Sequence, residues 1–214
     1  VMAGISLKEQ GYEGGLWRKQ KLVGIKAPVF SMSKLIGVDS YLGPEMKSTG
    51  EVMGIDYSFE AALVKALLAA GLMLPQKGGL LLSISDRDKA ESLPLIKKLH
   101  SVGYGLYATE GTAAMIDSMG LPVKMATKKL SEGHPNVVDV IQDNSVDGVI
   151  NTVTGGRIPL KDGFSIRRAA AEKRIPCFTS LDTARVAVEA LTRRQIFTVQ
   201  PLKEYLKRKR KNAK

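Results

Sequence analysis

From Gly79 onward, short apolar segments alternate with amphipathic ones, and this alternation limits the fold more than any other feature of the sequence. The predicted strands are residues 79–85, 104–109, 122–127, 148–153 and 176–180. The predicted helices are residues 90–102, 112–119, 136–142, 165–173 and 183–191. Strands that alternate with helices in short units form parallel sheets that are covered on both faces, with right-handed crossovers. The sequence therefore predicts an α/β fold with a doubly wound five-stranded parallel sheet.

The segment before this alternation has a different character, because it is rich in glycine, proline and serine and contains few long periodic stretches. One helix is predicted there, over residues 58–70, with Ser58 as its N-cap and Gly71 as its stop. We therefore expect an irregular appendage, residues 1–76, that packs on a regular domain, residues 77–214.

The composition is that of an ordinary globular protein, with 44% hydrophobic and 25% charged residues. No apolar run is long enough to cross a bilayer, and no partner membrane is expected. The single cysteine, Cys177, lies in an apolar context, which favours a buried structural thiol in a reducing, cytoplasmic compartment. Because the chain begins with Val1, we expect it to be a piece of a longer protein.

The net charge of +11 is concentrated at one end of the chain. Residues 203–214 hold seven Lys or Arg and one Glu, and without them the net charge would be +5. A basic run at a terminus is typically a solvated, frayed end. Binding of nucleic acid, with an affinity that falls steeply with salt, is the alternative. It is not expected, because no aromatic-interleaved groove or known nucleic-acid-binding module accompanies the run.

Polar residues gather where the predicted strands end, and ligands of open α/β sheets bind beyond these carboxyl ends. The strands are followed by the junctions 83–89, 108–112, 126–129, 151–157 and 179–183. The junctions carry the cations Lys89, Lys128, Lys129 and Arg157. Several junctions with lysines predict a phosphate site, although neither a P-loop nor a dinucleotide-binding glycine motif is present.

The stretch LYATEGTAAMI, residues 106–116, places threonine and glycine at a predicted helix N-terminus. Unpaired N–H groups there attract anions. Taken alone, however, this stretch favours a threonine that caps its own helix and binds no ligand over an anion site.

Few residues suggest catalysis. We interpret His100, on a predicted helix, as structural. His134, in the segment SEGHPN, is interpreted either as a solvated loop residue or as an acid or base. No His or Cys cluster has the spacing of metal ligands. We therefore assign no catalytic residue and no metal site.

Two sets of motifs resemble the large subunit of the carbamoyl-phosphate synthetases. KAPVFSMSKL and LGPEMKSTGEVMG, within residues 26–54, resemble the end of that subunit's second ATP-grasp synthetase unit. SISDRDK, YATEGTA, KKLSEG, VINT and SIRRAA resemble its carboxy-terminal regulatory domain, which shares its fold with methylglyoxal synthase and the IMP cyclohydrolase domain. The resemblance implies a carboxy-terminal fragment, a partial ATP-grasp segment followed by a methylglyoxal-synthase-like (MGS-like) allosteric domain with a basic tail.

The resemblance implies an effector site for a nucleoside monophosphate, UMP as an inhibitor or IMP. The residues that match the family's phosphate-binding positions are Lys89, Thr109, Gly111, Thr112 and Lys129. Those that match its base and ribose positions are Asn151, Thr152 and Thr154. Backbone N–H groups at Gly111 and Thr112 are expected to donate to the phosphate, and both Lys89 and Thr112 are expected to lie outside the core. Val153 stands where the family often has another threonine, so a contact there would be lost or made by the backbone.

The resemblance also implies properties of a whole enzyme, an ATP-dependent ligase that makes carbamoyl phosphate from bicarbonate, ATP and glutamine or ammonia. The full subunit would use ATP with Mg²⁺ or Mn²⁺, and a glutaminase small subunit would be its partner, whereas this fragment would hold no cofactor. Activation by ornithine is not expected, because Ala27 stands at the position of an acidic ligand. The sequence leaves three questions open: which nucleotide binds, whether the product feeds pyrimidine or arginine synthesis, and whether the chain forms homo-oligomers.

The competing hypothesis is an enzyme of the methylglyoxal synthase type, which would eliminate phosphate on the same scaffold. It needs a carboxylate base where this chain has His134, and an imidazole is a poor substitute for that base.

A further expectation concerns residues 1–57, which should expose apolar side chains such as Val29, Phe30 and Leu35 and be mobile or mediate self-association.

Overall fold

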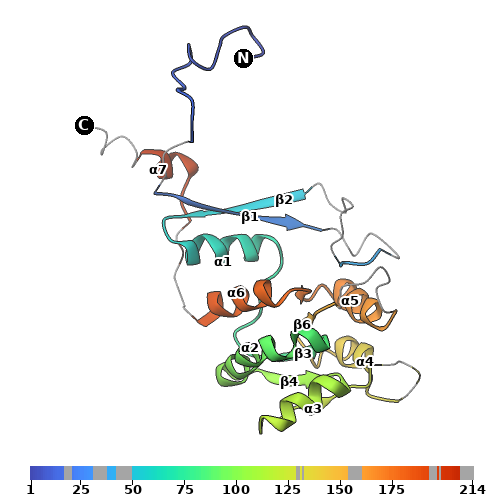
Figure 1. Ribbon diagram of the computed structural model, residues 1–214. Coiled ribbons are helices and arrows are strands. Elements are labelled where there is room, and N and C mark those ends of the chain that lie inside the picture. Colours follow the sequence, from blue (N-terminus) through green and yellow to red (C-terminus); the bar gives the residue numbers. More distant parts are fainter. Residues whose placement is uncertain are drawn as a thin grey trace.

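The chain forms the predicted five-stranded parallel sheet, in the order β5-β4-β3-β6-β7 (Figure 1). The computed structural model describes residues 1–16, 21–30, 38–41, 50–128, 131, 133–153, 161–192, 197 and 199–207, with the backbone alone at 161, 162, 206 and 207. The strands are β3 (Gly79–Ser83), β4 (Gly105–Ala108), β5 (Lys124–Met125), β6 (Gly148–Asn151) and β7 (Cys177–Phe178). The strand order reverses beside β3, where the chain crosses from one half of the sheet to the other, and this is where α/β sheets bind ligands.

Helices cover both faces of the sheet, which confirms the doubly wound prediction. They are α2 (Lys89–Val102), α3 (Glu110–Ser118), α4 (Val137–Gln142), α5 (Lys161–Lys173) and α6 (Leu181–Thr192), and a short 3-10 helix, η2 (Asp86–Asp88), precedes α2. Side chains of α2, α3 and α6 share one hydrophobic cluster, and those of α4 and α5 share the other.

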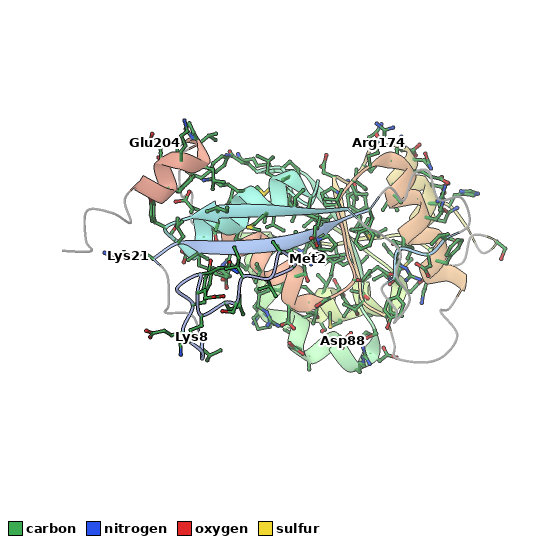
Figure 2. All side chains as sticks on the ribbon, turned by 90° about the horizontal axis from the view of Figure 1, so that it is seen from above. Met2, Lys8, Lys21, Asp88, Arg174 and Glu204 are labelled. Atoms are coloured by element: carbon green, nitrogen blue, oxygen red, sulfur yellow. The ribbon has the colours of Figure 1, made fainter. Side chains whose placement is uncertain are left out.

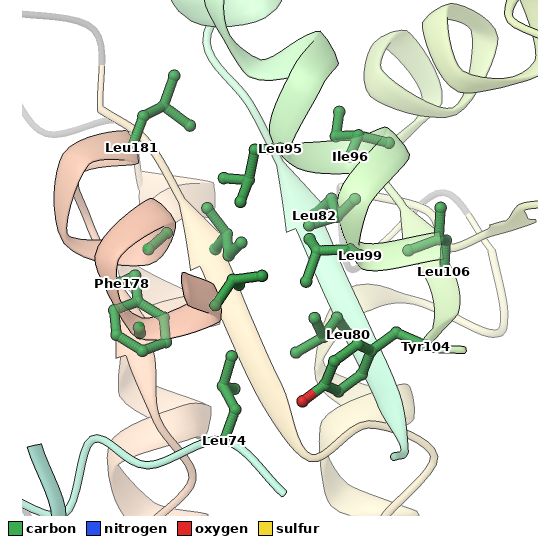
Figure 3. Close-up of a cluster of buried hydrophobic side chains, with 14 of the residues drawn as sticks. Leu74, Leu80, Leu82, Leu95, Ile96, Leu99, Tyr104, Leu106, Phe178 and Leu181 are labelled. Carbon is green, nitrogen blue, oxygen red and sulfur yellow. The ribbon is translucent and has the colours of Figure 1, made fainter. Parts of the chain in front are cut away.

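Strand β3 supplies both clusters, because successive side chains of a strand point to opposite faces. Leu80 and Leu82 enter the cluster beneath α2, whereas Leu81 enters the cluster beneath α4 and α5. Figure 3 shows Leu80 and Leu82 facing Leu99 of α2 across this core. Every residue of β3 is buried, so this strand is the centre of the domain.

The segment before the sheet is more regular than predicted. Strands β1 (Val23–Val29) and β2 (Gly50–Asp56) pair antiparallel over their whole length, so the expectation of an irregular appendage was wrong. Pairing between segments so far apart in sequence leaves no short-range turn signal that could have predicted it. The two strands lie over helix α1 (Phe59–Ala69), as Figures 1 and 2 show from the side and from above.

Helix α1 begins and ends where the sequence predicted. The Ser58 hydroxyl accepts a hydrogen bond from the Ala61 N–H at 3.2 Å, which satisfies a free donor of the first turn. Gly71 follows the helix with a φ of +71°, a left-handed conformation that glycine adopts without strain.

Helix α1 is also part of the main core, because Leu63, Val64 and Leu67 belong to the cluster beneath α2 and α6. On its other side, Lys65 forms an ion pair with Asp56 of β2 at 2.7 Å and donates to the Tyr205 hydroxyl at 2.7 Å. Tyr205 lies on helix α7 (Leu202–Lys207), so this helix contacts the first segment, residues 1–76. The hydrophobic core therefore spans the boundary predicted between residues 76 and 77.

The expected exposure of the first segment is found mainly at its start. Val1, Met2, Ile5, Leu7 and Leu16 are exposed, whereas Val29 and Phe30 are half-buried. Leu35 and the tail after residue 207 lie outside the described residues. In the part of the chain that the structure describes, every helix is too short or too polar to cross a bilayer.

Candidate functional site

A cavity of about 230 Å³ opens at the carboxyl ends of β3, β4 and β6. Six of the eight predicted effector residues line it: Lys89, Thr109, Gly111, Thr112, Asn151 and Thr152. The remaining two, Lys129 and Thr154, lie outside the described residues. The parallel sheet brings these distant positions together because all of its strands end at the same edge.

The turn into α3 offers backbone donors to this cavity. Thr109 is the N-cap of α3, but its side chain makes no capping hydrogen bond, so the interpretation of a threonine that only caps its own helix was wrong. The N–H groups of Glu110 and Gly111 lie in the first turn, where an α-helix provides no acceptor. The Thr112 N–H, which we expected to bind the ligand, instead donates to the Thr109 carbonyl at 2.9 Å. The backbone donors that this turn leaves available to a ligand are therefore the N–H groups of Glu110 and Gly111.

Lys89 places its ammonium group directly over that turn. A Cβ atom added to Gly111 would lie 3.2 Å from the Lys89 Nζ, so the glycine leaves the space that the ammonium group approaches. The same Nζ pairs with the Asp86 carboxylate at 2.7 Å. The hydrogen bond and the positive charge of Lys89 hold the pKa of Asp86 below its usual value. An anion in the cavity would therefore compete with Asp86 for this ammonium group.

Thr112 has a structural role that the sequence did not reveal. Its side chain is 1% exposed, and its hydroxyl accepts a hydrogen bond from the Ile84 N–H at 3.0 Å, in the loop after β3. The Thr109 hydroxyl lies 3.4 Å from the same oxygen. The expectation that Thr112 lies outside the core was therefore wrong, because α3 packs this residue against the sheet.

Replacing Thr112 by valine is expected to lower the free energy of unfolding by about 1–3 kcal/mol, because the buried Ile84 N–H would lose its acceptor. Thr112→Ser keeps the hydroxyl and is the matched control. Urea denaturation of both variants measures the difference. Equal stability of the valine and serine variants would contradict the structural role of this hydroxyl.

The end of β6 is joined to the loop after β3 by several hydrogen bonds. The Thr152 hydroxyl accepts from the Ser85 N–H at 2.8 Å, and the Thr152 N–H donates to the Ser83 carbonyl at 3.1 Å. The Val153 carbonyl accepts from Arg87 at 2.9 Å. Thr152 therefore shapes the cavity wall, and the carbonyl of Val153 is already engaged by Arg87.

Sequence reasoning missed two cations that line the cavity, Lys128 and Arg167. Lys128 was noted among the strand-end lysines but not assigned to the site. Its N–H donates to the carboxylate of Glu110 at 3.0 Å, which ties the loop after β5 to the start of α3. Arg167 belongs to the motif SIRRAA, but a helical arginine carries no local signal that it will be buried beside a cavity.

The remaining candidates for chemistry lie elsewhere. His134 pairs with Asp139 at the start of α4 and is absent from the described cavity wall. Cys177 is half-buried and not fully buried as predicted, but desolvation raises the pKa of its thiol to about 12, which agrees with an unreactive structural thiol. Among the described residues, no three His, Cys, Asp or Glu side chains are grouped closely enough to hold a metal ion.

Comparison with known proteins agrees with the motifs. Residues 91–179 match the MGS-like domain family. The chain is 53% identical over 206 residues to the carbamoyl phosphate synthase large chain of Thermomicrobium roseum, and the match covers 96% of this chain and 19% of that relative. The chain thus spans about a fifth of the length of this relative. It therefore carries an MGS-like domain and, over nearly its whole length, is homologous to part of a carbamoyl phosphate synthase large chain.

Proposed function

We propose that the chain is the regulatory region of a glutamine-dependent carbamoyl-phosphate synthase large subunit, and that its cavity binds a nucleoside monophosphate, UMP or IMP. The observation that carries this proposal is that the Lys89 ammonium group, the N–H groups of Glu110 and Gly111, and the Asn151 amide all line one cavity at the strand ends. An ammonium group over a helix N-terminus favours a phosphate. The amide and hydroxyl groups at the end of β6 would then face the nucleoside.

The charges of the cavity support an anionic ligand. Lys89 and Lys128 line it, against the two carboxylates Asp86 and Glu110, whereas the charge of Arg167, which also lines it, is balanced by its ion pair with Asp39. Both carboxylates are already engaged by the protein, Asp86 by Lys89 and Glu110 by the Lys128 N–H. An entering phosphate would accept hydrogen bonds from groups that the fold holds in place before the ligand arrives, which lowers the entropy lost on binding.

The test is a calorimetric titration of the chain with UMP, IMP, uridine, ornithine and inorganic phosphate. We expect a nucleotide to bind, inorganic phosphate to compete with it, and uridine to bind far more weakly because it lacks the phosphate. Ornithine is not expected to compete. Equal affinities for uridine and UMP would overturn the phosphate-binding role of the cavity.

The whole enzyme would supply the chemistry, and this region would regulate it. In that proposal the ATP-grasp units of the full subunit bind ATP with Mg²⁺ or Mn²⁺, and a glutaminase subunit delivers ammonia. Residues 1–76 would then be the last part of an ATP-grasp unit, and α1 within them would pack that part against the regulatory domain. No group of the described cavity is assigned a catalytic role.

A further inference from the structure

Arg167 on α5 has the largest fully buried side chain in the described part of the chain, at 1% exposure. A buried cation is stable only when it is paired and hydrogen-bonded. Its partner comes from the first segment, since Arg167 Nε donates to Asp39 Oδ1 at 2.6 Å and Nη2 donates to Asp39 Oδ2 at 2.5 Å. In Figure 1 the short segment 38–41 lies beside α5. This bidentate pair fixes the guanidinium plane.

The third side of the guanidinium group faces Asn151, at the end of β6. Arg167 Nη1 donates to Asn151 Oδ1 at 2.6 Å. Because arginine has donors and no acceptor, this bond holds the amide with its oxygen toward Arg167 and its NH₂ group away from it. One N–H of that group approaches the Ser83 carbonyl at 3.4 Å, and the other is left for a ligand in the cavity that Asn151 lines.

Gly163 makes room for this contact. A Cβ atom added at Gly163 would lie 2.8 Å from Arg167 Nη1 and 3.6 Å from Asn151 Oδ1. The absence of a side chain at Gly163 therefore lets the guanidinium and amide groups meet.

We infer that Arg167 is a positioning residue, which holds the Asn151 amide as a hydrogen-bond donor toward the ligand and is itself held by Asp39. The inference rests on the proposed nucleotide site and adds a specificity to it. The ligand atom that faces Asn151 is an acceptor, such as a carbonyl oxygen of the base or an oxygen of the ribose. Through Asp39, the first segment helps to set the orientation of this donor, so ligand binding and the placement of segment 38–41 are linked.

The experiment compares UMP with inorganic phosphate as probes in the same variants. Arg167→Met removes the guanidinium donors, and Asp39→Asn removes the bidentate acceptor while preserving volume. Relative to phosphate, the affinity for UMP is expected to fall about tenfold in Arg167→Met and about threefold in Asp39→Asn, the effect of one oriented hydrogen bond. Phosphate affinity should be retained, because Lys89 and the α3 turn are unchanged.

Matched controls come from the neighbouring ion pair of the same helix, Arg168 with Glu172 at 2.7 Å. Arg168→Met and Glu172→Gln should leave the ratio of UMP to phosphate affinity unchanged. An equal loss of both affinities in Asp39→Asn would mean general damage to the site and would overturn the positioning role. If Arg167→Met fails to fold, Asp39→Asn carries the test, because Asp39 is only partly buried.

A second readout needs no ligand and separates this inference from the proposed function. The side-chain NH₂ signals of Asn151 in a ¹⁵N NMR spectrum, assigned with Asn151→Asp, should shift in Asp39→Asn and stay in place in Glu172→Gln. Unchanged Asn151 signals in Asp39→Asn would overturn the inference even if UMP binds. Failure of UMP to bind the wild-type chain, with the shift present, would instead refute the nucleotide site alone.

Discussion

Replacing Lys89 by alanine is expected to weaken UMP binding by about 10- to 100-fold. A hydrogen bond to a charged group contributes roughly 1.5–3 kcal/mol, and each 1.4 kcal/mol corresponds to a factor of ten. The Lys89 ammonium group lies over the α3 turn, where the N–H groups of Gly111 and Glu110 would hold the phosphate. The fold should be unaffected, since the side chain of Lys89 is 27% exposed at the first residue of α2.

Two further variants sharpen this prediction. Lys97→Ala changes an exposed lysine of the same helix and should leave UMP affinity unchanged. Asp86→Asn removes the intramolecular competitor for the Lys89 ammonium group and should tighten UMP binding by about two- to fivefold, as expected for an exposed ion pair. The readout is calorimetric titration of the three variants with UMP. Unchanged affinity in Lys89→Ala would remove this residue from the site.

If the proposed function is correct, the same substitution should separate regulation from catalysis in the whole enzyme. Lys89→Ala should blunt the response to the nucleotide and leave the unregulated synthesis of carbamoyl phosphate nearly intact. The measurement is the rate of carbamoyl phosphate formation with and without UMP. Loss of activity in the absence of UMP would show that the cavity takes part in the reaction, and the regulatory proposal would then be wrong.

Replacing Gly54 by alanine is expected to lower the free energy of unfolding by at least about 3 kcal/mol, at the upper end of the usual cost of overpacking. A Cβ atom at Gly54 would lie 1.9 Å from the Ala62 carbonyl oxygen and 2.7 Å from the Ala66 nitrogen. Both of those atoms are helix backbone, so no side-chain rotation can relieve the contact. Strand β2 would have to move away from α1.

The effect should extend beyond the two-stranded sheet, because α1 contributes Leu63 and Leu67 to the main core. Gly24→Ala on the partner strand β1 is the matched control, since its Cβ would meet only the Met53 sulfur at an ordinary 3.6 Å. Denaturant unfolding gives the stability, and amide exchange of β1 and β2 locates the damage. Equal stabilities of the Gly54→Ala and Gly24→Ala variants would contradict the close packing of β2 on α1.

The sequence by itself determined the regular part of the fold and most of the site's position. Strand and helix periodicities are local, so the alternation after Gly79 was enough to predict all five strands and the helices between them. In a parallel sheet all strands end at the same edge. The residues that follow the strands, such as Lys89, Gly111 and Asn151, therefore lie together at that edge. Ser58 and Gly71 were predictable because helix caps depend on neighbouring residues only.

Tertiary structure alone decided the features that depend on distant partners. The β1–β2 pairing joins segments that are too far apart in the sequence for a short hairpin pattern to predict it. The burial of Thr112 follows from how α3 packs on the sheet, and a helical threonine looks the same in sequence whether it faces solvent or the Ile84 N–H. Arg167 is hydrogen-bonded to Asp39, which lies 128 positions earlier in the sequence. Such contacts exist only once the core has formed, because burial removes water as the competing partner and makes one particular pairing favourable.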